Sequence, residues 1–262
     1  MFKVSMHYFR IDRTAWFACT GILLLLGLLS LYEVRFKPYL GMTEMLAGIV
    51  PMFAGVVWAV ALFAREFESE SVVWSLSQDI SPVKWFICRM ASPLTSALVF
   101  GICVWGLVEL SQLRAGALGS TKNMMSYSYV AGHAFYPAFA TVVMVSIAAL
   151  AGVLLKKSIP TVAVTFALGL VLGTTGASWL NPLLPTEQGE FTGTGPDGSL
   201  LPVPGDVMDS KLLSNGQHLV EFHPNTAFWD TQMLYVILWA VLSVLLLGFA
   251  LLFFKHASKR AV

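Results

Sequence analysis

The stretch AREFESESVVWSLSQDISPVKW, residues 64–85, lies between two long apolar segments of the chain. It is too polar to cross a membrane and too regularly patterned for a slack loop. Acidic residues come first (Glu66, Glu68, Glu70), and apolar residues then recur at roughly helical spacing (Val72, Val73, Leu76, Ile80). The pattern predicts a short amphipathic helix on the membrane face, with acidic residues at its positive end. A solvated loop is the alternative interpretation.

The residues that close this stretch predict a return to the membrane. Pro82 ends a helix, and Lys84 and Trp85 are typical of residues that anchor a span at the membrane interface.

Composition places most of the chain in lipid. The 262 residues are 56% hydrophobic and only 12% charged, about half the charged share of a soluble domain. The net charge of +1 argues against a nucleic-acid partner. Cys19, Cys88 and Cys103 all fall in apolar runs without metal-ligand spacing, which indicates buried small hydrophobes.

Apolar runs near the length of a bilayer core predict an all-α integral membrane protein with six spans. The expected spans are about Trp16–Tyr32, Leu46–Ala64, Phe86–Leu110, His133–Leu155, Ile159–Leu180 and Thr231–Phe254. The first run is longer than a signal-peptide core and lacks a cleavage pattern, so a retained helix is expected. We treat residues 1–262 as one transmembrane domain.

The ends of the chain are expected in the cytoplasm of a plasma-membrane protein. Most of the 16 Lys and Arg residues fall in segments that would share that side, as the positive-inside rule requires. These are Lys3, Arg10, Arg13, Arg65, Lys84, Arg89, Lys156, Lys157, Lys255, Lys259 and Arg260. The head, residues 1–14, mixes basic and large apolar residues and predicts an amphipathic helix at the membrane surface.

A long acidic segment, residues 182–230, is expected outside the cell as a loop cap before the sixth span. It is rich in Gly and Pro and includes Gly193–Gly198, which formally matches a dinucleotide-binding pattern. Pro196 and its neighbours indicate a turn, without the strand and helix that such a site needs. His218 and His223 share the segment. They are interpreted as an exposed pair in a loop, and a metal site is the less favoured alternative. The acidic charge suits either a solvated loop or attraction of cationic peptides.

The sequence does not indicate that this chain catalyses a reaction by itself. It contains no HExxH, GxSxG or Walker A pattern. The predicted spans are nearly free of ionisable residues, except Arg89 and Glu109 near the two ends of the third. Carriers driven by protons or sodium usually hold such groups near the midplane. Uphill transport by this chain would therefore draw its energy from a partner.

Small residues recur one helical turn apart in the fourth and fifth expected spans. They are Ala148 and Gly152, and Gly169 and Gly173. This spacing lets helices approach closely, either within the chain or at a subunit interface.

Three stretches resemble permeases of the ABC-2 type exporters, and in particular an actinobacterial-like subgroup. The first is the opening stretch, which is similar to the pattern R-E-[FLY]-E-x-G-T-x-x-x-x-W-T-Q-S-V-[ST]-R-x-x-W. The aligned residues are Arg65, Glu66, Glu68, Gln78, Ser81 and Trp85, with Ser71 where Thr is usual. Glu70 replaces the usual Gly and Pro82 the usual Arg. AFYPAFATVVMVSIAALAGVLLKKSIPTVAVT and VEFHPNTAFWDTQ resemble two later parts of the same family.

The resemblance implies a six-span subunit that dimerises with a second permease, as a homodimer or heterodimer. Separate ATP-binding subunits would hold ATP and Mg²⁺ and dock on the cytoplasmic face, with no cofactor on this chain. It also implies that residues 65–85 form the coupling helix, with Arg65, Glu66, Glu68, Ser71, Gln78, Ser81 and Trp85 toward the ATPase, and that the head is an elbow helix.

The substrate is expected to be an amphipathic or hydrophobic compound or a peptide. Met52, Trp58, Trp105 and Met144 are candidate pathway-lining residues. Ordinary core packing explains the same four residues equally well. Two other classes stay open, a scaffold or sensor subunit that regulates a partner and a membrane-embedded enzyme. The spans lack paired polar groups, which counts against the enzyme.

Overall fold

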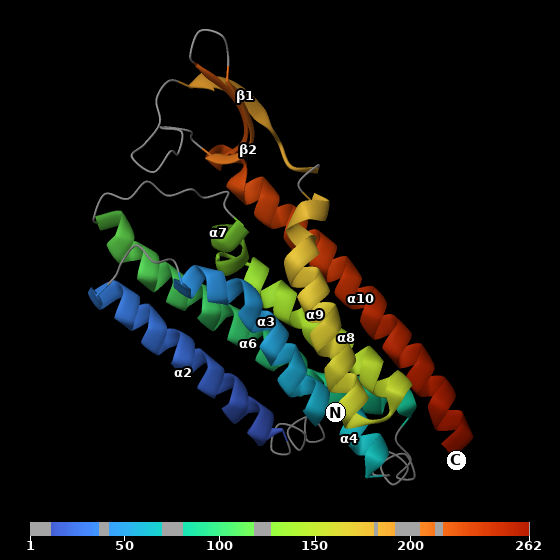
Figure 1. The fold of residues 1–262 in the computed structure, drawn as a ribbon. Coiled ribbons are helices and arrows are strands. Elements are labelled where there is room, and N and C mark those ends of the chain that lie inside the picture. The colour runs from blue at the N-terminus through green and yellow to red at the C-terminus, as the bar shows by residue number, and fades with distance from the viewer. Residues whose placement is uncertain are drawn as a thin grey trace.

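The computed structural model describes residues 12–36, 42–69, 81–117, 127–180, 183–191, 205–212 and 217–261. Long helices dominate these residues (Figure 1). They are α2 (Arg13–Phe36), α3 (Met42–Ala61), α6 (Pro82–Ala117), α8 (Tyr136–Leu155), α9 (Ser158–Leu180) and α10 (Phe228–Ala261). Two short helices accompany them, α4 (Phe63–Glu68) and α7 (Tyr127–Gly132).

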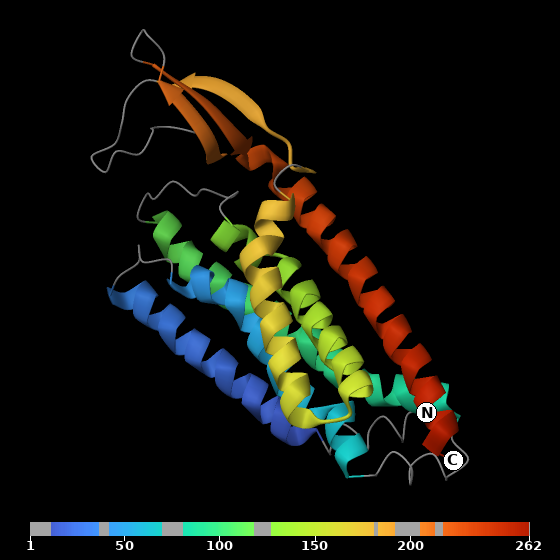
Figure 2. The same ribbon diagram turned by 45° about the vertical axis from the view of Figure 1, so that its right-hand side comes forward.

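The long helices run alternately in opposite directions along one bundle (Figure 2). The start of α2, helix α4, the α8–α9 turn and the end of α10 all lie at one end, called here the α4 end (Figure 1). A small sheet lies beyond the opposite end, called the sheet end. Helix α8 is the centre of the bundle, because α3, α6, α9 and α10 all pack against it.

Five helices of the described residues are long and apolar enough to cross a membrane. They contain α2, α3 with α4, α6, α8 and α10, and the described apolar part of α9, Ser158–Gly173, is shorter. The prediction of an all-helical integral membrane protein is confirmed. Each predicted span overlaps a long helix, although the second runs past the end of α3 into α4 and the fourth begins three residues before α8. The crossing by α9 stays a prediction.

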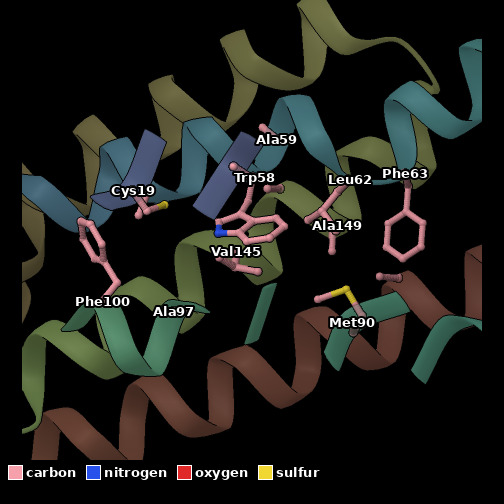
Figure 3. Close-up of a cluster of buried hydrophobic side chains, with 14 of the residues drawn as sticks. Cys19, Trp58, Ala59, Leu62, Phe63, Met90, Ala97, Phe100, Val145 and Ala149 are labelled. Atoms are coloured by element: carbon pink, nitrogen blue, oxygen red, sulfur yellow. The ribbon is translucent and has the colours of Figure 1, made fainter. Parts of the chain in front are cut away.

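The main core lies where α2, α3, α6 and α8 meet. Trp58 of α3 is fully buried there, and its indole N–H donates to Ser96 Oγ of α6 at 3.2 Å. Figure 3 shows Trp58 between Cys19 of α2 and Val145 and Ala149 of α8. A hydrogen bond satisfies the one polar atom that burial of a tryptophan would otherwise leave without a partner.

Small residues let these helices approach closely. A Cβ atom added at Gly101 of α6 would lie 2.1 Å from Ala138 Cα of α8, so no side chain fits there. Gly152 lies against Ala64, and Gly169 lies against Met52 and Met144. These two glycines of the predicted small-residue motifs therefore serve packing within the chain. Gly173 has open space at its Cβ position.

The segment before α10 was expected to be a loop cap with at most short local structure, and the structure adds a small sheet to it. It contains an antiparallel sheet of β1 (Glu187–Phe191), β2 (Gly205–Leu212) and β3 (His218–Pro224) in the order β1-β3-β2. In the central strand, Val220 and Phe222 are buried and point to one face. Strand β3 continues through the short helix η2 (Asn225–Ala227) into α10.

Two sequence predictions fall largely outside the described residues. They are the elbow helix over residues 1–14, of which only Asp12, Arg13 and Thr14 are described, and the amphipathic helix within residues 70–80.

Candidate functional site

The site begins with a break in the helix that leads into the opening stretch. Helix α3 ends at Ala61, and Leu62 has an extended backbone, with φ −85° and ψ −153°. In a continuous α-helix the Ala61 carbonyl would accept a hydrogen bond from the Arg65 N–H. That N–H instead reaches the Leu62 carbonyl at 3.2 Å. The Ala61 carbonyl accepts a hydrogen bond from Arg89 Nη2 at 2.6 Å, so this carbonyl stays paired although α4 leaves the axis of α3.

Arg89 of α6 joins three segments of the chain. Its Nη1 lies 2.6 Å from Asp12 Oδ2, at the start of α2, and its Nε lies 2.6 Å from Glu66 Oε1 of α4. The side chains of Arg89 and Asp12 are each only 1% exposed, and that of Glu66 is 14% exposed. A planar guanidinium can make these contacts at the same time, which the point charge of a lysine cannot. The cluster fixes α4 against α2 and α6.

Glu68 joins α4 to the beginning of α9. Its Oε1 accepts the backbone N–H of Ser158 at 2.8 Å, and its Oε2 accepts the Ser158 hydroxyl at 2.6 Å. A side chain from α4 thus takes the place of a local cap at this helix end. Lys156, in the turn before α9, adopts a left-handed backbone with φ 55° and holds its Nζ 5.4 Å from the centre of the Phe67 ring.

An aromatic cluster lies on the inner side of α4. The Phe63 ring stacks on Phe86 of α6 at 5.1 Å, and Trp85 of α6 stacks on Phe254 of α10 at 4.9 Å. Phe63 also lies 5.8 Å from both Trp85 and Phe254. Helix α4 therefore contacts α6, α8, α9 and α10, and Arg89 links it to Asp12 at the start of α2. We call α4 with these contacts the α4 hub.

The residues predicted to face an ATPase lie in different settings. Arg65 is exposed, Glu66 and Glu68 hold the hub as described, and Ser71 and Gln78 fall outside the described residues. Ser81 is exposed, and its Oγ accepts the Lys84 N–H at 3.3 Å in the first turn of α6.

The position of Trp85 differs from the predicted one. It was predicted to anchor the chain at the membrane interface, but it is 1% exposed, inside the aromatic cluster. The helix begins earlier than predicted, at Pro82, and this turns Trp85 inward toward Phe63 and Phe254.

Sequence reasoning missed the partners that make the hub. Arg89 was recognised as a charge inside the third span, without Asp12 or Glu66 as its partners. A buried charge requires opposite charges nearby, and that rule was the available signal. Ser158 gave no signal, because its partner lies 90 residues earlier in the chain.

The four candidate pathway residues separate into two groups. Met52 and Met144 line a cavity between α3, α8, α9 and α10. Trp58 lies in the main core, and Trp105 donates its indole N–H to Glu109 Oε1 at 3.1 Å near the sheet end of α6.

The stretch that leads into α10 also has a defined role. Gln232 is fully buried, and its Nε2 donates to the Val130 carbonyl of α7 at 2.9 Å. The contact ties the first turns of α10 to α7 at the sheet end.

Long apolar helices packed side by side in one bundle are the architecture of a multi-pass membrane protein. Residues 10–180 match the family model described as "ABC-2 membrane transporter related", and this match covers more than half of the chain. The chain therefore belongs to this family and is a membrane transport component of the ABC-2 permease type. No curated protein and no solved structure matches it. The subgroup expected from the sequence stays a prediction.

Proposed function

We propose that this chain is the permease subunit of an ATP-driven exporter, and that the α4 hub receives the force. Separate ATP-binding subunits dock at the α4 end and hold ATP and Mg²⁺. A second permease subunit, identical or different, completes the pathway. The transported molecule is an amphipathic or hydrophobic compound or peptide.

The distribution of charge supports a cytoplasmic α4 end. Exposed basic side chains gather there, while the exposed residues of the sheet include Glu187, Glu190 and Asp209. The basic residues are Arg13, Arg65, Lys84, Lys156, Lys157 and Lys255. Basic residues of membrane proteins concentrate on the cytoplasmic side, so both ends of the chain belong to that side. The protein then lies in the plasma membrane with the sheet outside.

The observation that carries the proposal is the connectivity of α4. This helix has only six residues, yet it is bound by an ion pair to Arg89 of α6, which also binds Asp12 at the start of α2, by hydrogen bonds to α9 and by ring contacts to α10. A displacement of α4 cannot leave these helices unmoved, because packed elements shift between discrete arrangements and do not deform continuously. A partner that pushes on residues 65–85 would therefore act on most of the bundle.

Within this proposal the acidic residues have different roles. Glu66 points inward to Arg89 and anchors α4 to the bundle. Glu68 passes motion of α4 to α9 through Ser158. Arg65 is exposed and available to a partner.

The proposal is tested with the complete transporter in proteoliposomes, by comparing Glu68→Lys with the matched Glu187→Lys on the sheet. Both residues are exposed, and loss of the Glu68 cap should cost only about 0.5–2 kcal/mol, so both variants should fold. Glu68→Lys should assemble with the ATPase and lose the substrate-stimulated part of ATP hydrolysis, while Glu187→Lys should keep it. Full stimulation and transport in Glu68→Lys would contradict the proposed path of force.

Glu66 needs a gentler change, because a lysine there would face Arg89. Glu66→Gln keeps the shape and removes the charge, and it should lower the stimulation of ATP hydrolysis by substrate. Wild-type stimulation in both Glu66→Gln and Glu68→Lys would remove α4 from the mechanism.

A further inference from the structure

The turn between α8 and α9 carries two exposed lysines at the level where the membrane core ends. Helix α8 runs from Tyr136 to Leu155 without a charged residue. At 1.5 Å per residue it is about 30 Å long, which is the thickness of the hydrocarbon core of a bilayer. Lys156 and Lys157 follow directly, and both are exposed. Their ammonium groups therefore lie among the lipid headgroups at the α4 end.

Ring contacts place other helix ends at the same level as this turn. The Lys156 Nζ lies 5.4 Å from the centre of the Phe67 ring of α4. The Phe67 ring lies 6.3 Å from Phe254 of α10, and Phe254 stacks on Trp85 of α6. Lys84, the exposed neighbour of Trp85, is thus a further basic residue near this level. The border between the membrane core and the headgroups therefore crosses the bundle here.

Exposed aliphatic side chains flank the two lysines on the membrane side. Leu154 and Leu155 end α8, and Ile159 in the first turn of α9 is 84% exposed. Lysines at such a border keep their charged heads among the headgroups while their stems lie on apolar surface. The turn thus offers positive charge and an apolar surface side by side, as the two parts of a phospholipid require.

The positive charge of the turn is only partly balanced within the described chain. The ion pairs formed between described residues do not involve Lys156 or Lys157. Glu68 is the carboxylate that contacts the turn, and both its oxygens accept hydrogen bonds from Ser158. Two ammonium groups therefore stand beside one carboxylate, and the excess of one positive charge favours an anion from outside the chain.

We propose that the α8–α9 turn binds an anionic phospholipid. Lys156 and Lys157 attract its phosphate, and Leu155 and Ile159 contact the upper part of its acyl chains. A zwitterionic lipid carries no net charge and gains less from the two lysines, so the turn selects anionic lipids. The inference rests on the membrane fold and goes beyond the proposed function, which only assigns this end to the cytoplasmic leaflet.

The test counts the lipids that stay on the purified full-length chain. The chain is equilibrated in mild detergent with equal parts of phosphatidylglycerol and phosphatidylcholine, and the bound lipids are identified by native mass spectrometry. Lys156→Gln combined with Lys157→Gln removes both charges, and Lys156→Arg combined with Lys157→Arg keeps them. All four substitutions are at exposed positions, so the variants should fold. Arg35→Gln is the matched control, because Arg35 is exposed in the last turn of α2 at the sheet end.

We expect the wild type to prefer phosphatidylglycerol, and this preference should fall by about fivefold for each lysine replaced by glutamine. The arginine variant and Arg35→Gln should keep it. Absence of the preference in the wild type, its persistence in the glutamine variant, or an equal loss in Arg35→Gln would overturn the site. A glutamine variant that loses an ATP-binding subunit and keeps the lipid would assign the turn to that partner and overturn the proposal. Selective lipid binding by a chain that binds no ATPase would refute the proposed function and leave the lipid site standing.

Discussion

The carboxylate of Glu68 caps a helix that begins 90 residues later in the chain. Its two oxygens accept the backbone N–H and the hydroxyl of Ser158, at 2.8 and 2.6 Å. A helix start usually finds its cap in the residue just before it. Here the cap belongs to the short helix α4, so the first turn of α9 and the position of α4 are linked directly.

Loss of this cap should weaken the protein by a small and measurable amount. Ser158→Ala removes the hydroxyl bond to Oε2 and keeps the N–H bond to Oε1, so the free energy of unfolding should fall by about 0.5–1.5 kcal/mol, the usual net contribution of one hydrogen bond. Ser158→Thr keeps the hydroxyl and is the control. Thermal unfolding in mild detergent, repeated with Glu68→Gln and with the double variant, should show that the two effects are not additive. Independent effects would mean that the two side chains do not act together.

Replacement of Arg89 should be far more damaging. Arg89→Met leaves Asp12 and Glu66 buried without their cation, and such a loss typically costs about 3–5 kcal/mol. Arg89→Lys keeps the charge and should still be destabilising, because a lysine cannot reproduce the three contacts. The control is Arg65→Lys, at an exposed position of α4. The amount of folded protein after extraction and its unfolding temperature measure the effect. Wild-type values for Arg89→Lys would show that charge alone is required.

Contact between α6 and α8 should be intolerant of any side chain at Gly101. Gly101→Val places atoms within 2.1 Å of the α8 backbone, so the helices must separate and the core must open. Gly106→Val, five residues further along α6, meets nothing within 4 Å and serves as the matched control. Size-exclusion profiles should show aggregation or loss of Gly101→Val only. If the two variants gave similar profiles, α6 and α8 would have to lie further apart at Gly101 than the structure shows.

The sidedness of the membrane topology can be read by cysteine labelling. In a variant lacking Cys19, Cys88 and Cys103, new cysteines replace exposed Ser81 at the α4 end or exposed Met208 on the sheet. A membrane-impermeant maleimide applied to intact cells should label Met208→Cys, and should label Ser81→Cys only after the cells are opened. The reverse pattern would place the α4 end outside.

Much of the membrane bundle could be predicted from the sequence, because long apolar runs have few structural alternatives in lipid. The break between α3 and α4 could not, since no proline or glycine marks Leu62. The break depends on Arg89, which donates a hydrogen bond to the Ala61 carbonyl in place of the helical N–H. Arg89 is 28 residues away in the sequence, so this contact exists only in the folded chain.

The sheet escaped prediction for a similar reason. Only β3 alternates clearly, with Val220 and Phe222 on one face, whereas β1 (EQGEF) has no apolar alternation. Its strand structure comes from pairing with β3, in which Glu187 faces Phe222 and Phe191 faces His218. For Glu66 and Glu68, coupling to an ATPase stays a prediction, and their partners within the chain, Arg89 and Ser158, are tertiary contacts that the sequence pattern does not reveal.

The most direct test of the central claim is a mild-detergent purification of the tagged chain from its native cells, with mass spectrometry of what accompanies it. The account predicts a stoichiometric subunit with a Walker A motif, which is retained by the wild type and by Glu187→Lys. It also predicts that the same subunit crosslinks to cysteines in the α4 end, such as Ser81→Cys, and not to Met208→Cys on the sheet. A pure chain without any ATP-binding subunit, under conditions that preserve such complexes, would contradict the account and favour a scaffold or sensor.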